Sequence, residues 1–124
     1  MHIVVFVDEF EADFAALPAD VQDELLAQLK VIEAFGPLAK RPRVDTLNGS
    51  KHRNMKELRF AAADGEWRVA FAFDPARQAA VLCAGDKSGG GEAAFYKALI
   101  RTADRRFDAH LARLKSKGAG RPRR

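Results

Sequence analysis

The sequence predicts an α+β fold: a small sheet of about four strands, antiparallel or mixed, with an N-terminal helical pair and a C-terminal helix. Three observations predict it. A short apolar run opens the chain, two apolar-alternating segments flank a turn dipeptide, and apolar residues recur at helical spacing on either side. The 124 residues suffice for one core. We expect one domain over residues 1–115 and a basic, disordered tail over residues 116–124.

The N-terminal third predicts one strand and two helices. Residues 2–7 are mostly β-branched or apolar, which indicates a buried strand. Asp8 is expected to cap the first helix, because Glu11 follows three residues later as in a capping box. Pro18 suits the first turn of a second helix, which Gly36 and Pro37 end. The apolar stripe of that helix is Val21, Leu25, Leu29 and Ile32.

Residues 37–53 predict an irregular connection, because prolines and the sequence Asn48-Gly49-Ser50 interrupt any periodicity. Long loops in compact domains are often functional. This one is rich in basic side chains: Lys40, Arg41, Arg43, Lys51, His52 and Arg53.

A hairpin is predicted for residues 55–61 and 66–73, because Asp64-Gly65 between them favours a type I′ turn. That turn sets Arg59 opposite Ala70 and Arg68 opposite Ala61, with the apolar side chains on the other face. The two arginines are then diagonal neighbours. Since their direct partners are alanines, we expect a shallow, open surface around the two guanidinium groups.

The rest of the chain predicts a strand, a connector and a long helix. Residues 78–85 are uniformly apolar, as is typical of a strand near the centre of a sheet. Residues 85–91 are rich in glycine and predict a flexible connector. Apolar residues recur at helical spacing over about residues 92–115.

Charge is distributed unevenly. The formal net charge is +4, yet residues 1–35 contain eight acidic residues and one basic residue. The remaining residues contain twenty basic and nine acidic residues. This asymmetry predicts an acidic outer face and a basic working face. A solvated sheet face that only keeps the protein in solution is the alternative reading.

Several function classes find no support in the sequence. No run of about 18 apolar residues and no secretory leader pattern is present, so we expect a cytoplasmic protein that does not enter a membrane. Neither a metal-ligand spacing nor a Walker-type loop occurs, and we expect no metal and no cofactor. The lone Cys83 lies in an apolar run and predicts a buried, inert thiol.

Four motifs carry a resemblance to a known family. They are residues 47–50 (Leu-Asn-Gly-Ser), 55–60 (Met-Lys-Glu-Leu-Arg-Phe), 67–75 (Trp-Arg-Val-Ala-Phe-Ala-Phe-Asp-Pro) and 85–87 (Gly-Asp-Lys). With the order of elements, they make the chain resemble the RelE/ParE toxin superfamily, and within it the HigB-like branch, also called phage Gp49-like. The resemblance covers about residues 2–114.

The resemblance implies a toxin of a type II toxin–antitoxin pair. HigB- and RelE-like members cut mRNA, usually on the ribosome, without a metal or cofactor. The implied partner is a helix-turn-helix antitoxin (HigA-like), and operator DNA is bound only through the complex with it. ParE-like members instead act on DNA gyrase, so a gyrase inhibitor is one alternative. A degenerate binding module that acts only with its antitoxin is another.

Residue roles follow from the same resemblance and from the chemistry of RNA cleavage, in which the ribose 2′-OH attacks the adjacent phosphate. Arg59 and Arg68 match strand arginines that stabilise the charged transition state. The resemblance does not identify the general base and the general acid, because relatives carry a lysine-rich stretch where this chain keeps only Lys87. The candidate bases are Lys56, Lys87 and His52, and the candidate acids are Tyr96 and Lys97. The expected RNA-binding residues are Lys51, Arg53, Arg77 and Lys97.

Three of these assignments have competing structural readings. Arg59 could form a surface ion pair with Glu57 or Glu66. Tyr96 could pack beside Phe95 on its helix rather than face the hairpin. His52 is the one histidine well placed for acid–base work, whereas His2 and His110 are expected to be structural or exposed.

Overall fold

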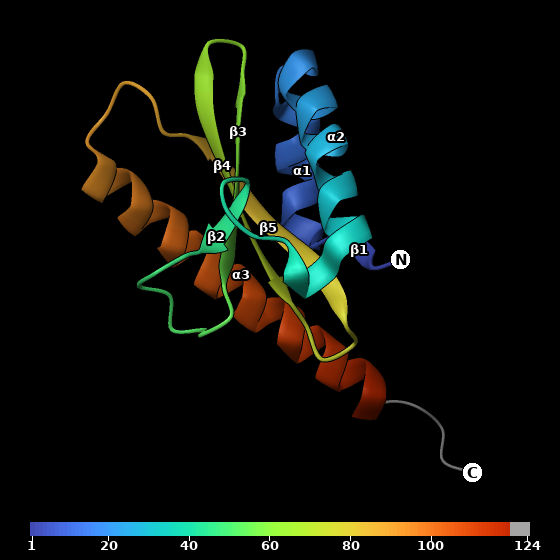
Figure 1. Cartoon of the computed structure of the whole chain (residues 1–124). Coiled ribbons are helices and arrows are strands. Elements are labelled where there is room, and N and C mark those ends of the chain that lie inside the picture. Colours follow the sequence, from blue (N-terminus) through green and yellow to red (C-terminus); the bar gives the residue numbers. More distant parts are fainter. Residues whose placement is uncertain (120–124) are drawn as a thin grey trace.

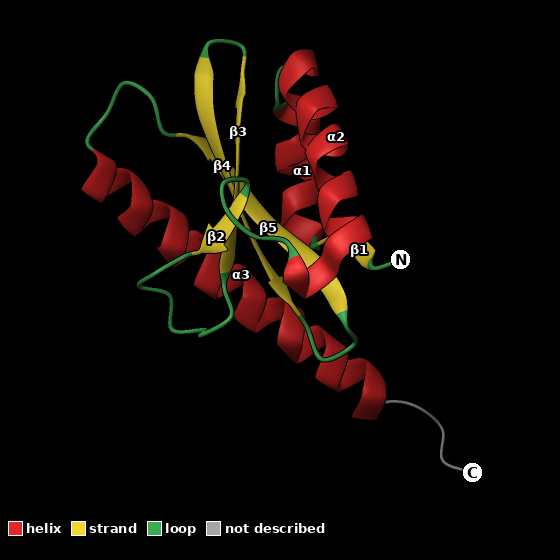
Figure 2. Cartoon of the chain, viewed as in Figure 1, coloured by secondary structure: helices red, strands yellow, loops and turns green. Residues whose placement is uncertain are grey.

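A computed structural model describes residues 1–119 of the chain. Three helices surround one five-stranded sheet (Figures 1 and 2). The strands are β1 (Ile3–Phe6), β2 (Val44–Thr46), β3 (Lys56–Ala62), β4 (Gly65–Phe73) and β5 (Gln78–Asp86). The helices are α1 (Asp8–Ala16), α2 (Ala19–Phe35) and α3 (Glu92–Ala119), and a 3-10 turn, η1 (Gly36–Leu38), follows α2.

The sheet is mixed, with strand order β1-β5-β4-β3-β2. β1 runs parallel to β5, and every other neighbouring pair is antiparallel. The predicted α+β class is therefore confirmed. The strand count differs by β2, which lies inside the stretch predicted to be irregular. The three residues of β2 are too few to show a period, and β2 exists because Val44 and Thr46 pair with β3.

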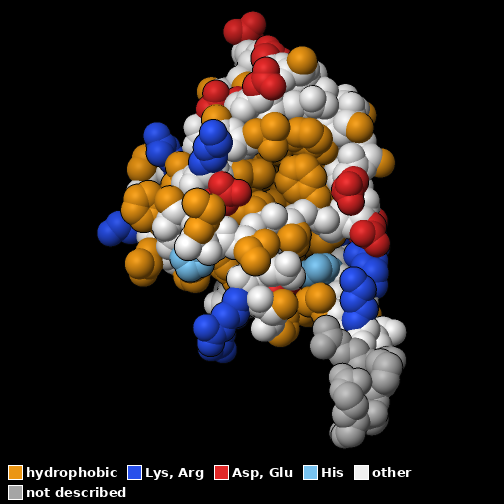
Figure 3. Space-filling model, turned by 90° about the vertical axis from the view of Figure 1, so that its right-hand side faces the viewer, with side chains coloured by type: hydrophobic (Ala, Val, Ile, Leu, Met, Phe, Trp, Pro, Cys, Tyr) orange, Lys and Arg blue, Asp and Glu red, His pale blue; other side chains and the backbone are white. Residues whose placement is uncertain are grey.

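One face of the sheet is covered by α1 and α2 (Figure 1). The contact between them is made through large apolar side chains. Leu25 and Ile32 of α2 are fully buried, as are Leu58 of β3 and Phe71 of β4. On this side of the molecule, both acidic and basic side chains border a hydrophobic patch on the surface (Figure 3). The apolar stripe predicted for α2 is thus its core face, and the acidic residues of the N-terminal third remain outside.

The other face of the sheet packs against α3 through small side chains. Ala70 and Ala72 of β4 are buried, and the Sγ of Cys83 lies 3.6 Å from the carbonyl oxygen of Leu99. A Cβ added to Gly85 would come within 2.8 Å of Phe95. The alanines of the hairpin therefore do not leave an open surface, because they let α3 lie close to the sheet. Burial raises the pKa of Cys83 to about 12, which fits an inert thiol.

The first helix begins differently from the prediction. Val7, not Asp8, is the N-cap, and no side chain caps the helix. The Val7 amide donates to the Val81 carbonyl, so β1 leads into α1 with only Val7 between them, and the apolar side chain of Val7 cannot cap the helix. Asp8, Glu9 and Glu11 still lie in the first turn, where carboxylates complement the helix dipole.

The hairpin register also corrects the prediction. The turn residues are Ala63 and Asp64, both with positive φ, and Gly65 pairs with Ala62. Gly65 belongs to β4 because it pairs with Ala62, and a Cβ there would lie 2.6 Å from the Asp86 carboxylate. The register is displaced by two residues, so every side chain keeps its predicted face. Arg59 and Arg68, however, are direct partners rather than diagonal neighbours.

The C-terminal helix extends beyond its predicted end at residue 115 and reaches Ala119. Residues 116–119 of the expected tail are therefore helical, and residues 120–124 lie outside the described residues. Within residues 1–119 no helix is long and apolar enough to span a membrane.

Candidate functional site

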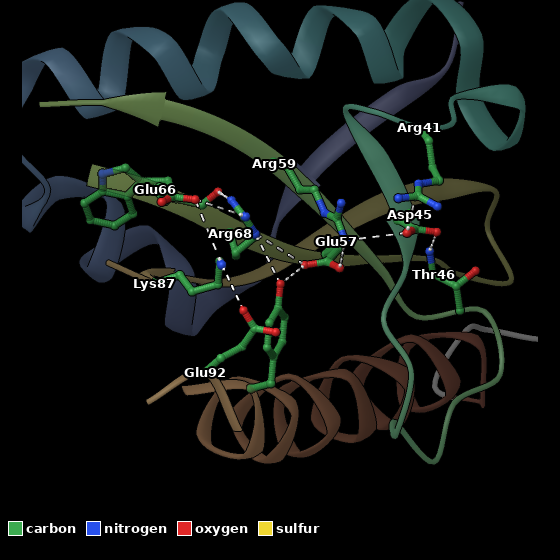
Figure 4. A network of polar contacts seen from close by, with 11 residues as sticks. Arg41, Asp45, Thr46, Glu57, Arg59, Glu66, Arg68, Lys87 and Glu92 are labelled. Carbon is green, nitrogen blue, oxygen red and sulfur yellow. Dashed lines mark hydrogen bonds and ion pairs between the residues drawn. The ribbon is translucent and has the colours of Figure 1, made fainter. Parts of the chain in front are cut away.

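The site begins with two arginines on adjacent strands. Arg59 of β3 pairs directly with Arg68 of β4, and both side chains point to the α3 face of the sheet (Figure 4). Directly opposed side chains have Cβ atoms only about 4.5–5.5 Å apart, so like charges there repel unless a counter-charge intervenes. Glu57 lies two residues before Arg59 on β3 and therefore on the same face.

Glu57 supplies that counter-charge. Its side chain is 5% exposed, and its two oxygens contact different partners. Oε1 accepts a hydrogen bond of 2.7 Å from the Tyr96 hydroxyl and lies 3.8 Å from Arg68 Nε. Oε2 accepts a 3.0 Å hydrogen bond from Arg59 Nη2, which raises the pKa of Arg59 above its ordinary value. We call Glu57, Arg59, Arg68 and Tyr96 the arginine cluster.

Tyr96 closes the arginine cluster from the first turns of α3. Its hydroxyl accepts a 3.2 Å hydrogen bond from Arg68 Nε while donating to Glu57. Burial, and after it the hydrogen bond to Glu57, raises the pKa of Tyr96 above its ordinary value of 10.0. Of the two readings left open for Tyr96, the structure shows the one in which it faces the hairpin; its ring also contacts Phe95 edge-on.

Arg68 is the more enclosed of the two arginines, with a side chain 12% exposed. Its Nη1 donates to the carbonyl oxygen of Trp67 at 3.0 Å, and its Nη2 lies 3.6 Å from Glu66. Arg59 has one buried donor, Nε, with no hydrogen-bond partner within residues 1–119. The cluster therefore holds both guanidiniums in place and leaves one donor on Arg59 unsatisfied.

Further ion pairs surround the arginine cluster on both sides (Figure 4). Asp45 lies 3.5 Å from Arg59 and 3.5 Å from Arg41. Lys87 donates to Glu92 at 3.1 Å and lies 4.0 Å from Glu66. The whole network balances four basic side chains with four acidic ones: Arg41, Arg59, Arg68 and Lys87 against Asp45, Glu57, Glu66 and Glu92. The predicted open basic face is thus wrong, because carboxylates and Tyr96 fill it.

A cavity of about 330 Å³ opens beside Arg59 and Tyr96. It is within the size range of small-molecule sites, about 300–1,000 Å³. Its walls come from β2 and the residues after it, from β3 and from the start of α3. They are Asp45, Thr46, Leu47, Asn48, Glu57, Arg59, Glu92 and Tyr96. A chain carrying a phosphate could therefore approach Arg59 from this side.

Lys87 joins the network through the turn that follows β5. Asp86 accepts hydrogen bonds from the Glu66 amide at 3.0 Å and from the Ser88 hydroxyl at 2.6 Å. The bonds from Ser88 and Glu66 lower the pKa of Asp86. The Lys87 amide donates to the Glu66 carbonyl at 2.7 Å, which extends the strand pairing to Lys87. Lys87 is the one predicted base that the structure brings next to Arg68.

Lys56 is not part of the arginine cluster. Side chains alternate along β3, so Lys56 points to the opposite face from Glu57 and Arg59. Its ammonium lies 3.5 Å from the Thr46 hydroxyl, at the edge formed by β2. The odd separation of three residues between Lys56 and Arg59 could have indicated this from the sequence.

His52 and Lys51 lie on a second polar cluster, away from the arginines. The His52 ring nitrogen Nε2 lies 2.8 Å from Asp108 of α3, its ring contacts Phe107, and Lys51 pairs with the same carboxylate. The Ser50 hydroxyl donates to Asp104 at 2.5 Å. We call Ser50, Lys51, His52, Asp104 and Asp108 the loop cluster. Asp108 lies twelve residues beyond Tyr96, about 18 Å along the helix axis.

The remaining predicted RNA-binding residues are exposed and dispersed. Arg53 lies in the loop, Lys97 lies next to Tyr96 on α3, and Arg77 lies in the turn after β4. That turn is at the opposite end of the β4 strand from the β3–β4 turn, so Arg77 is remote from Arg68. Among the predicted RNA-binding residues, Lys97 is thus the one adjacent in sequence to a residue of the arginine cluster.

Glu57 is the residue that sequence reasoning missed, having considered it only as an ion-pair partner of Arg59. The sequence feature that could have indicated its role is the spacing Glu57-x-Arg59, which places the acidic and the basic side chain on the same face of a strand. Within residues 1–119 no group of three or more histidines, cysteines or carboxylates could hold a metal ion. The chemistry available to the arginine cluster is therefore that of guanidiniums, one carboxylate and one phenol.

Comparison with known proteins gives one family and two relatives. Residues 12–108 match the family described as phage-derived protein Gp49-like. The chain is 42% identical over 107 residues to toxin HigB2 of Mycobacterium tuberculosis (strain ATCC 25618 / H37Rv), covering 86% of this chain. It is 40% identical over 109 residues to toxin HigB3 of the same strain, covering 88% of this chain and 93% of HigB3. The match spans 53% of HigB2, about half its length. No solved structure gives a significant match.

Proposed function

This chain belongs to the Gp49-like family and is a HigB-like toxin of the RelE/ParE superfamily, and on that premise we propose that it is a metal-independent endoribonuclease that cleaves mRNA on the ribosome. The observation that carries the proposal is the direct pairing of Arg59 and Arg68 beside the hydroxyl of Tyr96. Two guanidiniums on rigid strands can hold a phosphate bidentately, as a flexible lysine cannot.

The reaction requires no metal. The ribose 2′-oxygen attacks the adjacent phosphorus, the bond to the 5′-oxygen of the next nucleotide breaks, and the products carry a 2′,3′-cyclic phosphate and a 5′-hydroxyl. Negative charge grows on the phosphoryl oxygens in the transition state. Arg59 and Arg68 stabilise this charge through their guanidinium groups.

Two proton transfers accompany the attack. Tyr96, whose pKa is raised, stays protonated at neutral pH and protonates the leaving 5′-oxygen. Glu57 takes the proton of the 2′-hydroxyl, since within residues 1–119 it is the one carboxylate in contact with both Arg59 and Tyr96. Lys87 adds positive charge at the edge of the site. Lys51, Arg53 and Lys97 contribute electrostatic attraction for RNA at greater distance, as does Arg77.

The substrate tests this proposal directly. Purified toxin is incubated with a defined mRNA bound to ribosomes in magnesium, and with the same mRNA free of ribosomes, and the 5′ ends are mapped. We expect cleavage on the ribosome that disappears when the scissile nucleotide carries a 2′-deoxyribose, because the nucleophile is then absent. The 2′-deoxy substitution one nucleotide away is the matched control. Cleavage of the 2′-deoxy substrate contradicts the mechanism.

A second candidate is a non-catalytic toxin or binding module. The charge balance around Arg59 and Arg68 favours it, because each guanidinium already has carboxylates nearby. In that case expression without an antitoxin leaves cellular mRNA intact. Arrested growth with intact mRNA and impaired supercoiling indicates gyrase as the target, whereas normal growth indicates a module without toxic activity.

The partner proposed for this toxin is a helix-turn-helix antitoxin of the HigA type, which represses the operon as a complex with the toxin. The two relatives are named as toxins, which supports an antitoxin partner for this chain. Co-expression with the neighbouring reading frame, followed by co-purification and a gel-shift assay with the operator, tests this assignment. Operator binding by the toxin alone contradicts it.

A further inference from the structure

A groove lies between the last turns of α2 and the segment that follows it. Its volume is about 380 Å³, within the range of ligand sites. It lies apart from the cavity beside Arg59, with which it shares no lining residue. We call it the α2 groove; its lining is Val31, Phe35, Leu38, Ala39, Lys40, Arg41, Pro42 and Arg43.

The floor of the α2 groove is apolar and uncovered. The Phe35 residue is 56% exposed and Leu38 is 79% exposed. They are two of the five large hydrophobic residues that are exposed within residues 1–119, and they lie three positions apart in the sequence. Isolated exposed hydrophobic side chains need no explanation, but a contiguous apolar patch with a polar border marks an interaction site.

The border of the groove is basic. Lys40, Arg41 and Arg43 are all exposed. Arg41 shares Asp45 with Arg59, whereas no carboxylate of residues 1–119 lies within ion-pair distance of Lys40 or Arg43. This border contrasts with α1 and α2 up to Glu33, which carry eight acidic residues and one basic residue. A partner that fits the groove must therefore present carboxylates around an apolar anchor.

We propose that the α2 groove docks an acidic, amphipathic peptide segment of a partner protein, with apolar side chains on Phe35 and Leu38 and carboxylates on Lys40 and Arg43. The lining favours a peptide over RNA, because Val31, Leu38, Ala39 and Pro42 are aliphatic and only one aromatic ring is present for base stacking. Helix-in-groove recognition uses apolar anchors at helical spacing. This surface is separate from RNA cleavage and does not require it.

Binding of a synthetic peptide to the full chain tests the proposal. The probe is a fluorescent peptide of about 16 residues, or about four helical turns, with leucines on one face and glutamates elsewhere. A peptide of the same composition with scattered leucines controls for amphipathicity. One with lysines in place of glutamates controls for charge. We expect anisotropy to report binding of the first peptide and at least tenfold weaker binding of both controls, about 1.4 kcal/mol.

Variants of the toxin locate the binding. We expect Leu38→Ser and the double variant Lys40→Glu with Arg43→Glu each to weaken binding about tenfold. Leu26→Ser, at an exposed apolar residue of α2 outside the groove, and the double variant Arg101→Glu with Arg105→Glu on α3 are matched controls that leave it unchanged. Circular dichroism verifies that each variant is folded.

Four results overturn the proposal. One is equal binding of the scattered-leucine peptide, and another is equal loss in the control variants. A third is displacement of the peptide by single-stranded RNA with the same dependence on Lys40 and Arg43, which would make the groove a nucleic-acid surface. The fourth is a toxin dimer in sedimentation that Leu38→Ser dissociates, since a second copy would then be the occupant.

Discussion

Two polar clusters contact α3 in different ways. In the arginine cluster, at the start of the helix, the carboxylate belongs to the sheet: the Glu57 side chain is 5% exposed and contacts two arginines and Tyr96. In the loop cluster, farther along the helix, the carboxylates belong to α3 itself, and the Asp108 side chain is 43% exposed. The sequence presents candidates for chemistry in both, yet only one of them lies beside the paired arginines.

The difference lies in what holds each group. Strand pairing fixes Arg59 and Arg68 relative to each other, and α3 adds Tyr96 from a third element. The loop that carries His52 is held by side-chain contacts to α3. Sites built on rigid elements keep their geometry to within fractions of an ångström, whereas exposed ion pairs contribute little. The two clusters should therefore respond very differently to substitution.

The largest effect is expected on folding, from Glu57→Ala. Removing this carboxylate leaves two opposed guanidiniums without their shared counter-charge, and breaking a buried pair in this way costs about 3–5 kcal/mol. Urea unfolding measures the loss. Asp104→Ala in the loop cluster is the matched control, with an expected cost below about 1 kcal/mol. Equal losses in the two variants would contradict the contrast between the clusters.

A large effect on activity is expected from Arg68→Ala. Loss of one preorganised donor to the phosphorane lowers the cleavage rate about 10²–10³-fold. His52→Ala is expected to change the rate less than about threefold, since its ring contacts Asp108 rather than the arginines. Single-turnover cleavage of a defined mRNA compares the two. Full activity of the Arg68 variant removes that side chain from the mechanism, and a large loss in the His52 variant extends the site to the loop cluster.

Tyr96→Phe removes the hydroxyl and keeps the ring. If Tyr96 is the acid, the rate falls about 100-fold. Because the pKa of Tyr96 is raised, its protonated form persists to pH values above 10.0, and wild-type activity should decline only in that range. The phenylalanine variant should lack this alkaline decline. A pH–rate profile with an unchanged alkaline limb would mean that another group provides the proton.

Much of the fold could be predicted from the sequence, because the spacing of apolar residues along the chain depends only on the local type of secondary structure. The apolar stripe of α2 and the two faces of the hairpin follow from spacing alone. The position of the β3–β4 turn was predicted with an error in register of two residues. The sequence suggests that Gly65 is a turn residue with positive φ, whereas Gly65 lies in β4 and approaches Asp86 closely. β2 has three residues and no period of its own, and it depends on pairing with β3.

The candidate site was partly predictable for the same reason. Arg59 and Arg68 share a face in either register, because the displacement is an even number of residues. Tyr96 and Lys87 meet them only through the tertiary fold, and no local pattern could show that contact. The fate of His52 depends on Asp108, fifty-six residues away in the sequence. Carboxylates on elements distant in the sequence form ion pairs with some of the basic side chains, and these pairs could not be predicted from local spacing.

The smallest effect concerns Asp108 and depends on pH. Hydrogen bonds from Lys51, and then from His52, lower its pKa in the folded protein below the ordinary value of 3.8. A carboxylate with a lowered folded-state pKa adds stability above its unfolded-state pKa and loses it as pH falls through the folded value. Asp108→Asn should thus lower Tm at pH 7 by at most about 4 °C, because the pair is exposed. Calorimetry at decreasing pH should show wild type and variant converging below pH 3.8. A deficit that persists in acid would mean that Asp108 acts through packing, and the loop cluster would then resemble the arginine cluster more than its exposure suggests.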